Sequence, residues 1–224
     1  MTAPLSIQDA TVEELAQRVL ALTAGGARAL VGLTGAPGAG KSTLAATLLA
    51  ALGSRARLVP MDGFHLAQTR LEALGRADRK GAPDTFDVHG YVALLARLRA
   101  RPDHVVHAPE FRRDLEEPIA GAVDVPPDVD VVLTEGNYLL LETPGWADVR
   151  AQLDEVWFVE VDEETREGRL VARHERFGRS HDAAVAWARD VDGPNATLVR
   201  ATQGRADLVV GGWAGALPVA SRVP

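Results

Sequence analysis

The sequence contains no cysteine among its 224 residues. Disulfide bonds and metal sites with thiolate ligands are therefore excluded, in keeping with the reducing environment of the cytoplasm. No apolar run reaches the length that a membrane span needs. The first ten residues also lack the basic start and apolar core of a signal peptide. These absences predict a cytoplasmic protein without a membrane partner.

Basic residues are fewer than acidic ones, and 24 Lys and Arg against 31 Asp and Glu give a net charge of -7. This balance argues against a nucleic-acid partner, because nucleic-acid binding usually requires a basic face. Hydrophobic residues at 46% and charged residues at 25% are ordinary values for a globular protein. A chain of this length predicts one domain over residues 1–224. A homodimer is compatible with this composition.

Apolar strands alternate with amphipathic helices along the chain. This alternation predicts an α/β fold of three layers, with a core parallel sheet covered by helices on both faces. Prolines, charges and short apolar pairs between Phe111 and Pro127 predict a hairpin instead of another strand and helix. The expected strands are 28–34, 57–60, 104–107, 129–134, 156–161 and 207–210. The expected helices are one within residues 1–26 after a Thr11–Glu14 capping box, 41–52, one capped by Asp87 up to Arg99, 163–176, and one capped by Ser180.

The segment that begins at Gly35 reads GAPGAGKS and matches G-x-x-x-x-G-K-[ST] between a strand and a helix. Glycine is needed there because backbone N–H groups must approach phosphate oxygens closely, and the helix N-terminus adds partial positive charge. Lys41 can reach the β- and γ-phosphates, and the Ser42 hydroxyl can bind Mg²⁺. The nucleotide-binding residues are therefore expected to be Gly35, Ala36, Pro37, Gly38, Ala39, Gly40, Lys41, Ser42 and Thr43.

A second phosphate-site element is the apolar strand that ends at Glu135. An acid at the end of such a strand is typical of a carboxylate that holds Mg²⁺, usually through water. We expect Glu135 to act with Ser42 in binding the metal. The alternative interpretation is an acid at a strand end that has no role.

Asp62 follows the short strand after the P-loop helix. The C-terminal ends of parallel strands gather at the ligand crevice, so Asp62 should lie near the γ-phosphate. A carboxylate there can orient an attacking hydroxyl or accept its proton. Since Asp-Gly is also a common turn pair, the alternative is a turn residue without a catalytic role.

Four arginines between positions 166 and 176 are spaced by three, four and three residues, which places them on one face of a helix. They can form a solvated face that pairs with neighbouring glutamates. They can instead belong to a mobile lid over about residues 163–190, which neutralises the transferring phosphoryl group and excludes water. The four are Arg166, Arg169, Arg173 and Arg176.

The motifs occur in the order typical of the phosphoribulokinase/uridine kinase/pantothenate kinase family of P-loop kinases, which the sequence resembles over most of its length. Within that family it is most similar to the bacterial nucleoside/nucleotide kinase-like and fructose-transport kinase-like branch. The matching segments are GAPGAGKS at Gly35, MDGFH at Met61, RKGAPDTFD at Arg79, APEF at Ala108, VVLTEGNYLL at Val131, RLVARH at Arg169 and RADLVV at Arg205.

The resemblance implies that Asp62 is the catalytic aspartate and that the segment from Lys80 to Asp87 lies beside the acceptor. His65 and Phe111 fall where uridine kinases carry tyrosines near the nucleoside, so uridine itself is not favoured. The resemblance favours Arg169 and Arg173 as lid arginines over the other two. The residues implied to contact the acceptor are Asp62, His65, Lys80, Phe86, Phe111 and Glu135.

The histidines show no tight ligand spacing, which argues against a zinc site, and only His65 is expected near a substrate. Trp157 and Phe158 lie in a predicted core strand, so we expect them to pack and not to stack on a ligand. Asn195 follows Pro194 at the start of the last helix. It either serves only to start that helix or, as the resemblance suggests, lies near the adenine.

These observations predict a kinase that uses ATP and Mg²⁺ to phosphorylate a hydroxyl of a small-molecule substrate, either a nucleoside or a sugar. The expected catalytic residues are Lys41, Asp62, Arg169 and Arg173. A pantothenate-like acid is the alternative acceptor, because of the segment at Lys80. A regulatory nucleotide switch or metal-delivery GTPase is the alternative from another class. That alternative requires an Asn-Lys-x-Asp motif, which the sequence lacks, and leaves Asp62 without a task.

Overall fold

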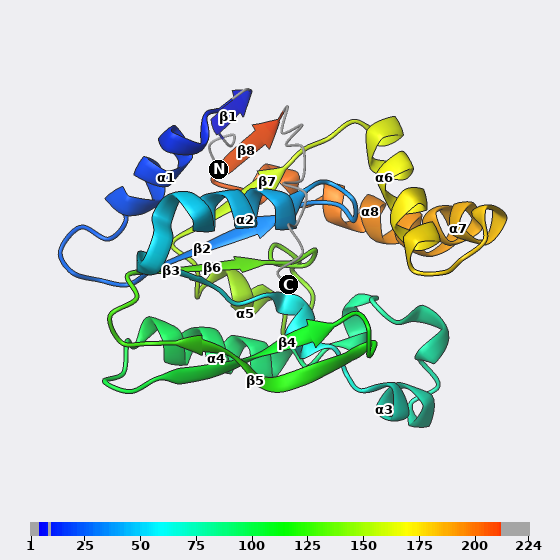
Figure 1. Cartoon of the computed structure of the whole chain (residues 1–224), viewed down its shortest axis with the longest axis horizontal. Coiled ribbons are helices and arrows are strands. Elements are labelled where there is room, and N and C mark those ends of the chain that lie inside the picture. Colours follow the sequence, from blue (N-terminus) through cyan, green and yellow to red (C-terminus); the bar gives the residue numbers. More distant parts are fainter. Residues whose placement is uncertain (1–4, 9, 212–224) are drawn as a thin grey trace, which may run out of the picture.

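The computed structural model describes residues 5–8 and 10–211 of the chain. Within them a six-stranded sheet runs in the order β1-β8-β7-β2-β6-β3, and every pair in it is parallel (Figure 1). The central strand β2 is buried along its whole length, and its neighbour β6 is buried up to Glu135, as expected for a parallel sheet with helices on both faces. The strands are β1 (Leu5–Gln8), β2 (Ala29–Thr34), β3 (Ala56–Leu58), β6 (Val131–Glu135), β7 (Glu155–Val159) and β8 (Leu208–Gly211).

Two apolar clusters pack on opposite faces of the sheet, which confirms the predicted three layers. One cluster joins Val31 and Leu33 to helices α1 and α2, and the other joins Leu30 to the helices of the opposite face. Figure 1 shows α1 and α2 on one side of the sheet and α4 and α5 on the other. The helices that cover the sheet are α1 (Val12–Ala21), α2 (Lys41–Leu52), α4 (Val88–Arg99), α5 (Ala147–Arg150) and α8 (Gly193–Arg200).

A separate antiparallel hairpin, β4 (Val106–Arg112) and β5 (Glu117–Val125), lies beside α4 (Figure 1). The sequence correctly predicts a hairpin, but it places a separate strand at 104–107 and the hairpin only from Phe111. In the structure one strand continues through Pro109, where the register shifts between Ala108 and Glu110. Proline lacks an N–H donor and is tolerated at such an irregularity, so it does not end the strand.

The chain start contains more structure than the predicted helix alone. The capping box of α1 is confirmed, since the Thr11 hydroxyl accepts from the Glu14 N–H and the Glu14 carboxylate accepts from the Thr11 N–H. The edge strand β1 precedes it and pairs with β8. The sequence did not predict β1, because four residues are too few to show a period. No helix in the described residues is both long and apolar enough for a membrane span.

A helical region projects beyond the C-terminal ends of the strands at one end of the sheet (Figure 1). It consists of α6 (Glu163–Arg176) and α7 (His181–Trp187), which lead into α8. The α6 bounds are those predicted, and Ser180 caps α7 by accepting from the Ala183 N–H at 3.4 Å. A short helix, α3 (Gln68–Ala73), lies near the hairpin on the other side of the site. The sheet edge between these two regions carries the motifs.

Candidate active site

The P-loop joins β2 to α2 and wraps the N-terminus of that helix, as its sequence predicts. Two of its glycines are required by the backbone. Gly40 caps α2 with a φ of 103°, and Gly35 has a φ of 149° and a position where a Cβ would lie 2.5 Å from the Val159 carbonyl oxygen. The Ala39 N–H is used within the loop, where it donates to the Ala36 carbonyl oxygen at 3.0 Å. The positive end of the 12-residue helix remains directed at the phosphate position.

Lys41 is buried, and its side chain folds back over the loop. Its Nζ donates to the carbonyl oxygens of Gly35 at 2.9 Å and Ala36 at 3.1 Å, and to Asn137 Oδ1 at 2.7 Å. Burial lowers the pKa of the Lys41 ammonium to about 8, although Glu135 and Asp62 oppose the shift. Burial destabilises the charged form of Lys41, so binding of a negatively charged phosphate next to it should be favourable.

Ser42 and Glu135 meet as the sequence predicts. The Ser42 hydroxyl donates to Glu135 Oε1 at 2.8 Å, and burial raises the pKa of the Glu135 carboxyl above its usual range. Among the described residues no cluster of three or more His, Asp or Glu side chains could hold a metal. A hydroxyl and one carboxylate nevertheless fit Mg²⁺ in a kinase, because the metal takes its other ligands from phosphates and water.

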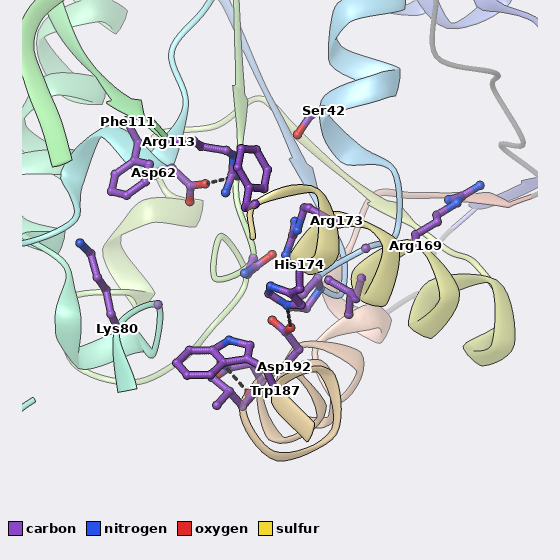
Figure 2. Close-up of a pocket in the computed structure, with 18 of the residues that line it drawn as sticks. Ser42, Asp62, Lys80, Phe111, Arg113, Arg169, Arg173, His174, Trp187 and Asp192 are labelled. Atoms are coloured by element: carbon purple, nitrogen blue, oxygen red, sulfur yellow. Dashed lines mark hydrogen bonds and ion pairs between the residues drawn. The ribbon is translucent and has the colours of Figure 1, made fainter. Parts of the chain in front are cut away.

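Asp62 lies in a 3₁₀ turn, Met61–Phe64, that follows β3 at the C-terminal edge of the sheet. The turn packs tightly on the hairpin, since a Cβ at Gly63 would lie 2.4 Å from the Pro109 carbonyl oxygen. The Asp62 carboxylate is one-third exposed and lies 3.6 Å from Arg113 Nη2 (Figure 2). Its predicted position, in one cavity with the P-loop, agrees with the structure. Its role as a base stays a prediction.

Four of the predicted acceptor residues, His65, Lys80, Phe86 and Phe111, gather on one wall, whereas Glu135 pairs with Ser42. The His65 ring lies 4.1 Å from that of Phe86 and 4.7 Å from that of Phe111, measured between ring centroids. Burial lowers the pKa of the His65 imidazole, which favours its neutral form, so the three rings form an uncharged aromatic surface. Lys80 Nζ lies 5.4 Å from the Phe111 ring centroid and points toward it in Figure 2.

The four arginines of helix α6 have different surroundings: three line the cavity and one is buried behind the P-loop. Arg173 lines the cavity, and burial lowers the pKa of its guanidinium below the usual value. Arg169 also lines the cavity, but it donates to the Ala39 carbonyl oxygen at 3.3 Å and extends away from Arg173 in Figure 2. Arg166 is buried behind the P-loop, where it donates to Pro37 and pairs with Glu163 at 2.6 Å. Arg176 is an exposed lining residue.

The structure adds residues that sequence reasoning missed. Arg113, at the hairpin tip, faces Asp62, and Asn137 holds Lys41. Asn137 lies within the matched VVLTEGNYLL segment, and Arg113 lies two residues after Phe111, so both positions carried some signal. A second histidine, His174, also lines the cavity, where it pairs with Asp192 at 2.8 Å. The expectation that only His65 lies near a substrate stays a prediction.

One cavity of about 1060 Å³ is lined by most of these groups, but not by Arg166 or by the P-loop residues Gly35, Ala36 and Ala39. The P-loop residues Lys41, Ser42 and Thr43 form one part, and Asp62, Lys80 and Phe111 form another. Asn195 lines it as well, and its side chain donates to the Val191 carbonyl oxygen at 3.1 Å as part of α8. Trp157 and Phe158 are buried in the core, as predicted. The cavity is large enough for a nucleotide and a second small molecule together.

Comparisons with known proteins agree with this geometry. No family model matches the chain. A uridine kinase-like protein of Schizosaccharomyces pombe is 30% identical over 209 residues, which cover 88% of this chain and 89% of that protein. The pantothenate kinase of Latilactobacillus sakei is 28% identical, over 81% of this chain and 67% of that enzyme.

A solved structure from Silicibacter sp. TM1040, of a fructose transport system kinase-like protein, superimposes with a TM-score of 0.80 at 44% sequence identity. The match covers 89% of this chain and 98% of that one. Both the extent and the level of these similarities exceed what a shared fold alone would give. The chain therefore belongs to the uridine kinase and pantothenate kinase family of P-loop kinases, enzymes that use ATP to phosphorylate a hydroxyl group.

Proposed function

We propose that this kinase transfers the γ-phosphoryl group of Mg-ATP to a hydroxyl of a nucleoside or a sugar, with Asp62 as the base. One observation carries the proposal: Asp62 faces the cavity that also contains Lys41 and the Ser42–Glu135 pair. A carboxylate that faces the phosphate-binding loop from a separate segment can act as the base in phosphoryl transfer to a hydroxyl. A nucleotide switch does not need such a base.

On the nucleotide side, the backbone of the P-loop and the Lys41 ammonium bind the phosphates. Lys41 leaves its carbonyl partners for the phosphate oxygens, and this exchange gives its buried charge a charged partner. Ser42 and Glu135 would hold Mg²⁺, which when bound neutralises charge on the β- and γ-phosphates. Arg166 positions this machinery from behind, through its contact with the Pro37 carbonyl.

On the acceptor side, Asp62 orients the hydroxyl and accepts its proton. The acceptor oxygen forms a bond to the γ-phosphorus, the bond from that phosphorus to the β-phosphate bridging oxygen breaks, and ADP leaves. Arg113 lies 3.6 Å from Asp62, where it can hold the carboxylate in position for the acceptor hydroxyl. Arg173 supplies positive charge from the lid, where transfer spreads negative charge over the phosphoryl oxygens.

The neutral aromatic wall of His65, Phe86 and Phe111 supports an acceptor with a planar or ring-shaped body. A pantothenate-like acid is the second candidate, and the half-buried Lys80 ammonium beside this wall favours it. Both candidates use the same hydroxyl chemistry at Asp62. The two candidate acceptors differ in the chemical group that they would place next to Lys80, at the end of the molecule away from the hydroxyl.

The test is a screen of ATP consumption by the purified protein over nucleosides, sugars and pantothenate, with the product identified by mass. We expect one acceptor class to give a product heavier by one phosphoryl group, and Asp62→Asn to abolish its formation. Hydrolysis of ATP at equal rates with and without every acceptor, in wild type and variant alike, would contradict the proposal.

A further inference from the structure

The cations that line the cavity are mostly without carboxylate partners. Among the described residues, only Arg113 of this group lies within 4.0 Å of a carboxylate, that of Asp62. Most arginines elsewhere in the described chain do form such pairs. The contrast arises in a chain with a net charge of -7, where carboxylates are plentiful. The lining cations are Lys41, Lys80, Arg113, Arg169, Arg173, Arg176 and Arg179.

ATP accounts for only part of this charge. Lys41 lies within the P-loop, and Arg169 contacts its backbone at Ala39, so both belong to the nucleotide side. Lys80 lies on the other wall, against Phe111 of the hairpin. A triphosphate bound at the P-loop does not explain why an unpaired ammonium is kept beside the acceptor.

The groups around the Lys80 ammonium are hydrogen-bond acceptors and an aromatic ring, and none of them carries a compensating negative charge. Within residues 5–8 and 10–211, Lys80 Nζ contacts only neutral groups: the Glu116 carbonyl oxygen, Gln68 Oε1 at 3.5 Å and the Phe111 ring. The preceding residue, Arg79, is exposed and pairs with Asp84 at 2.7 Å. The two adjacent cations therefore differ: Arg79 has a carboxylate partner outside the cavity, and Lys80 lines the cavity without one in the described part of the chain.

Asp62 fixes which part of an acceptor can meet Lys80. The hydroxyl to be phosphorylated must lie at Asp62, and an anionic group close to that carboxylate would be repelled. Arg113 already compensates the charge of Asp62, so it leaves Lys80 as the unpaired cation of this wall. An acceptor that spans the wall can therefore place its hydroxyl at Asp62 and a negative charge at Lys80.

We propose that the acceptor already carries an anionic group, a carboxylate or a phosphate monoester, and that Lys80 binds it. The inference rests on the proposed function and narrows its substrate class to hydroxy acids and phosphorylated sugars or nucleosides. A charge-assisted hydrogen bond to a half-buried ammonium is worth enough to give at least a roughly tenfold preference over a neutral acceptor.

The experiment uses acceptors in matched pairs that differ in the anionic group: pantothenate and panthenol, ribose 5-phosphate and ribose, a nucleoside 5′-monophosphate and its nucleoside. Each is assayed with Mg-ATP, and the product mass locates the transfer. The anionic member of the productive pair should have a kcat/KM at least about tenfold higher. The pair that responds distinguishes a carboxylate from a phosphate. Equal rates within it, or preference for the neutral member, would overturn the inference.

Two variants separate recognition from structure. Lys80→Gln should reduce the ratio of kcat/KM between the paired acceptors to near one. Arg70→Gln removes a positive charge from an exposed position of α3 that does not line the cavity, and it should keep the wild-type ratio. If Lys80 only pins the hairpin tip through Glu116, its variant will lose thermal stability and retain the ratio, which would also overturn the inference.

A binding measurement keeps the inference separate from the proposed function. The protein is saturated with Mg-AMP-PNP, so that the P-loop is filled, and inorganic phosphate is then titrated by calorimetry. Wild type and Arg70→Gln should bind phosphate, and Lys80→Gln should bind it at least about fivefold more weakly. Absence of phosphorylation with every pair would count against the proposed function alone. Equal phosphate binding by all three proteins would count against the Lys80 site alone.

Discussion

The two walls of the cavity are built in opposite ways. The nucleotide wall is centred on one run of residues, Gly35–Ser42, to which Glu135 and Arg169 add side chains from other segments. The acceptor wall is assembled from side chains of segments far apart in the sequence, around Asp62, Lys80 and Phe111. Binding of a common ligand is thus encoded locally, while choice of acceptor depends on tertiary structure and can change by single substitutions.

The walls also differ in their electrostatics. Lys41 is buried against carbonyl oxygens at a depressed pKa, so the nucleotide wall keeps a charge under unfavourable conditions until phosphate arrives. On the acceptor wall, Asp62 and Arg113 are partly exposed and face each other, and Lys80 is half-buried. The conflict between stability and function should therefore be stronger at the deeply buried Lys41 than on the acceptor wall.

The largest effect should come from Lys41→Met on the nucleotide wall. The substitution keeps the length and apolar stem of the side chain but removes the charge that binds the phosphates. Turnover should fall by about 10³-fold or more, with the fold retained. Steady-state kinetics and circular dichroism measure the two quantities. A folded variant with near wild-type turnover would contradict the P-loop assignment.

The next effect should come from Asp62→Asn on the acceptor wall. Asparagine preserves the shape but cannot accept the proton, so transfer should fall by about 10²-fold or more. Affinity for ATP should change little, because Asp62 belongs to the other wall. Calorimetry with ATP and product formation by mass test both parts. A similar loss of ATP affinity in Asp62→Asn would contradict the assignment of Asp62 to the acceptor wall alone.

The same division explains how much of the site the sequence predicts. The P-loop, the Glu135 strand end, and the bounds of α2 and α6 depend on short-range patterns, and the structure has them where they were expected. Arg113 lies at an exposed hairpin tip, where an arginine looks like any solvated charge. Only the packing of the hairpin on the Asp62 turn brings it to the site.

Strand partners are equally hidden from local patterns. Residues 104–107 show the apolar character of a strand, but nothing in them says that the strand pairs with β5 outside the main sheet. The His174–Asp192 pair joins α6 to a π-helical turn, Ala188–Asp192, at the start of α8, across 18 positions of sequence. Spacing along one helix cannot predict such a contact.

A smaller effect concerns the stability of the nucleotide wall without ligand. Burial lowers the pKa of Lys41 to about 8 in the folded state, below the unfolded value. Below pH 8 the folded protein holds a buried ammonium at a cost that disappears as the pH approaches the unfolded pKa. Lys41→Met should therefore be more stable than wild type by about 2 kcal/mol at pH 7, and the difference should shrink by pH 9.5.

Denaturant unfolding of both proteins without nucleotide at the two pH values measures this difference. Titration of the other ionisable groups is common to the two proteins and cancels in the comparison. A Met variant less stable than wild type at pH 7 would mean that the hydrogen bonds of Lys41 to Gly35 and Ala36 outweigh its burial.

The smallest effect, about tenfold, tests whether helix α6, the proposed lid, follows the same division. Arg173 lies on the side of α6 that faces Asp62, while Arg169 contacts the P-loop backbone at Ala39 (Figure 2). An interaction that strengthens in the transition state lowers kcat when removed, and one made equally to bound ATP raises KM. Arg173→Gln should therefore lower kcat by at least about tenfold with little change in ATP affinity.

Arg169→Gln should instead raise the KM for ATP by a similar factor with kcat largely kept. Arg176→Gln, at an exposed position on the cavity edge, serves as the matched lid control and should change both constants less. The two main variants have the same chemical change, one helical turn apart on the same helix, so a difference between them reports position and not charge. Identical losses in kcat for both variants would mean that Arg169 and Arg173 act together in the transition state. The division into a nucleotide wall and an acceptor wall would then not extend to α6.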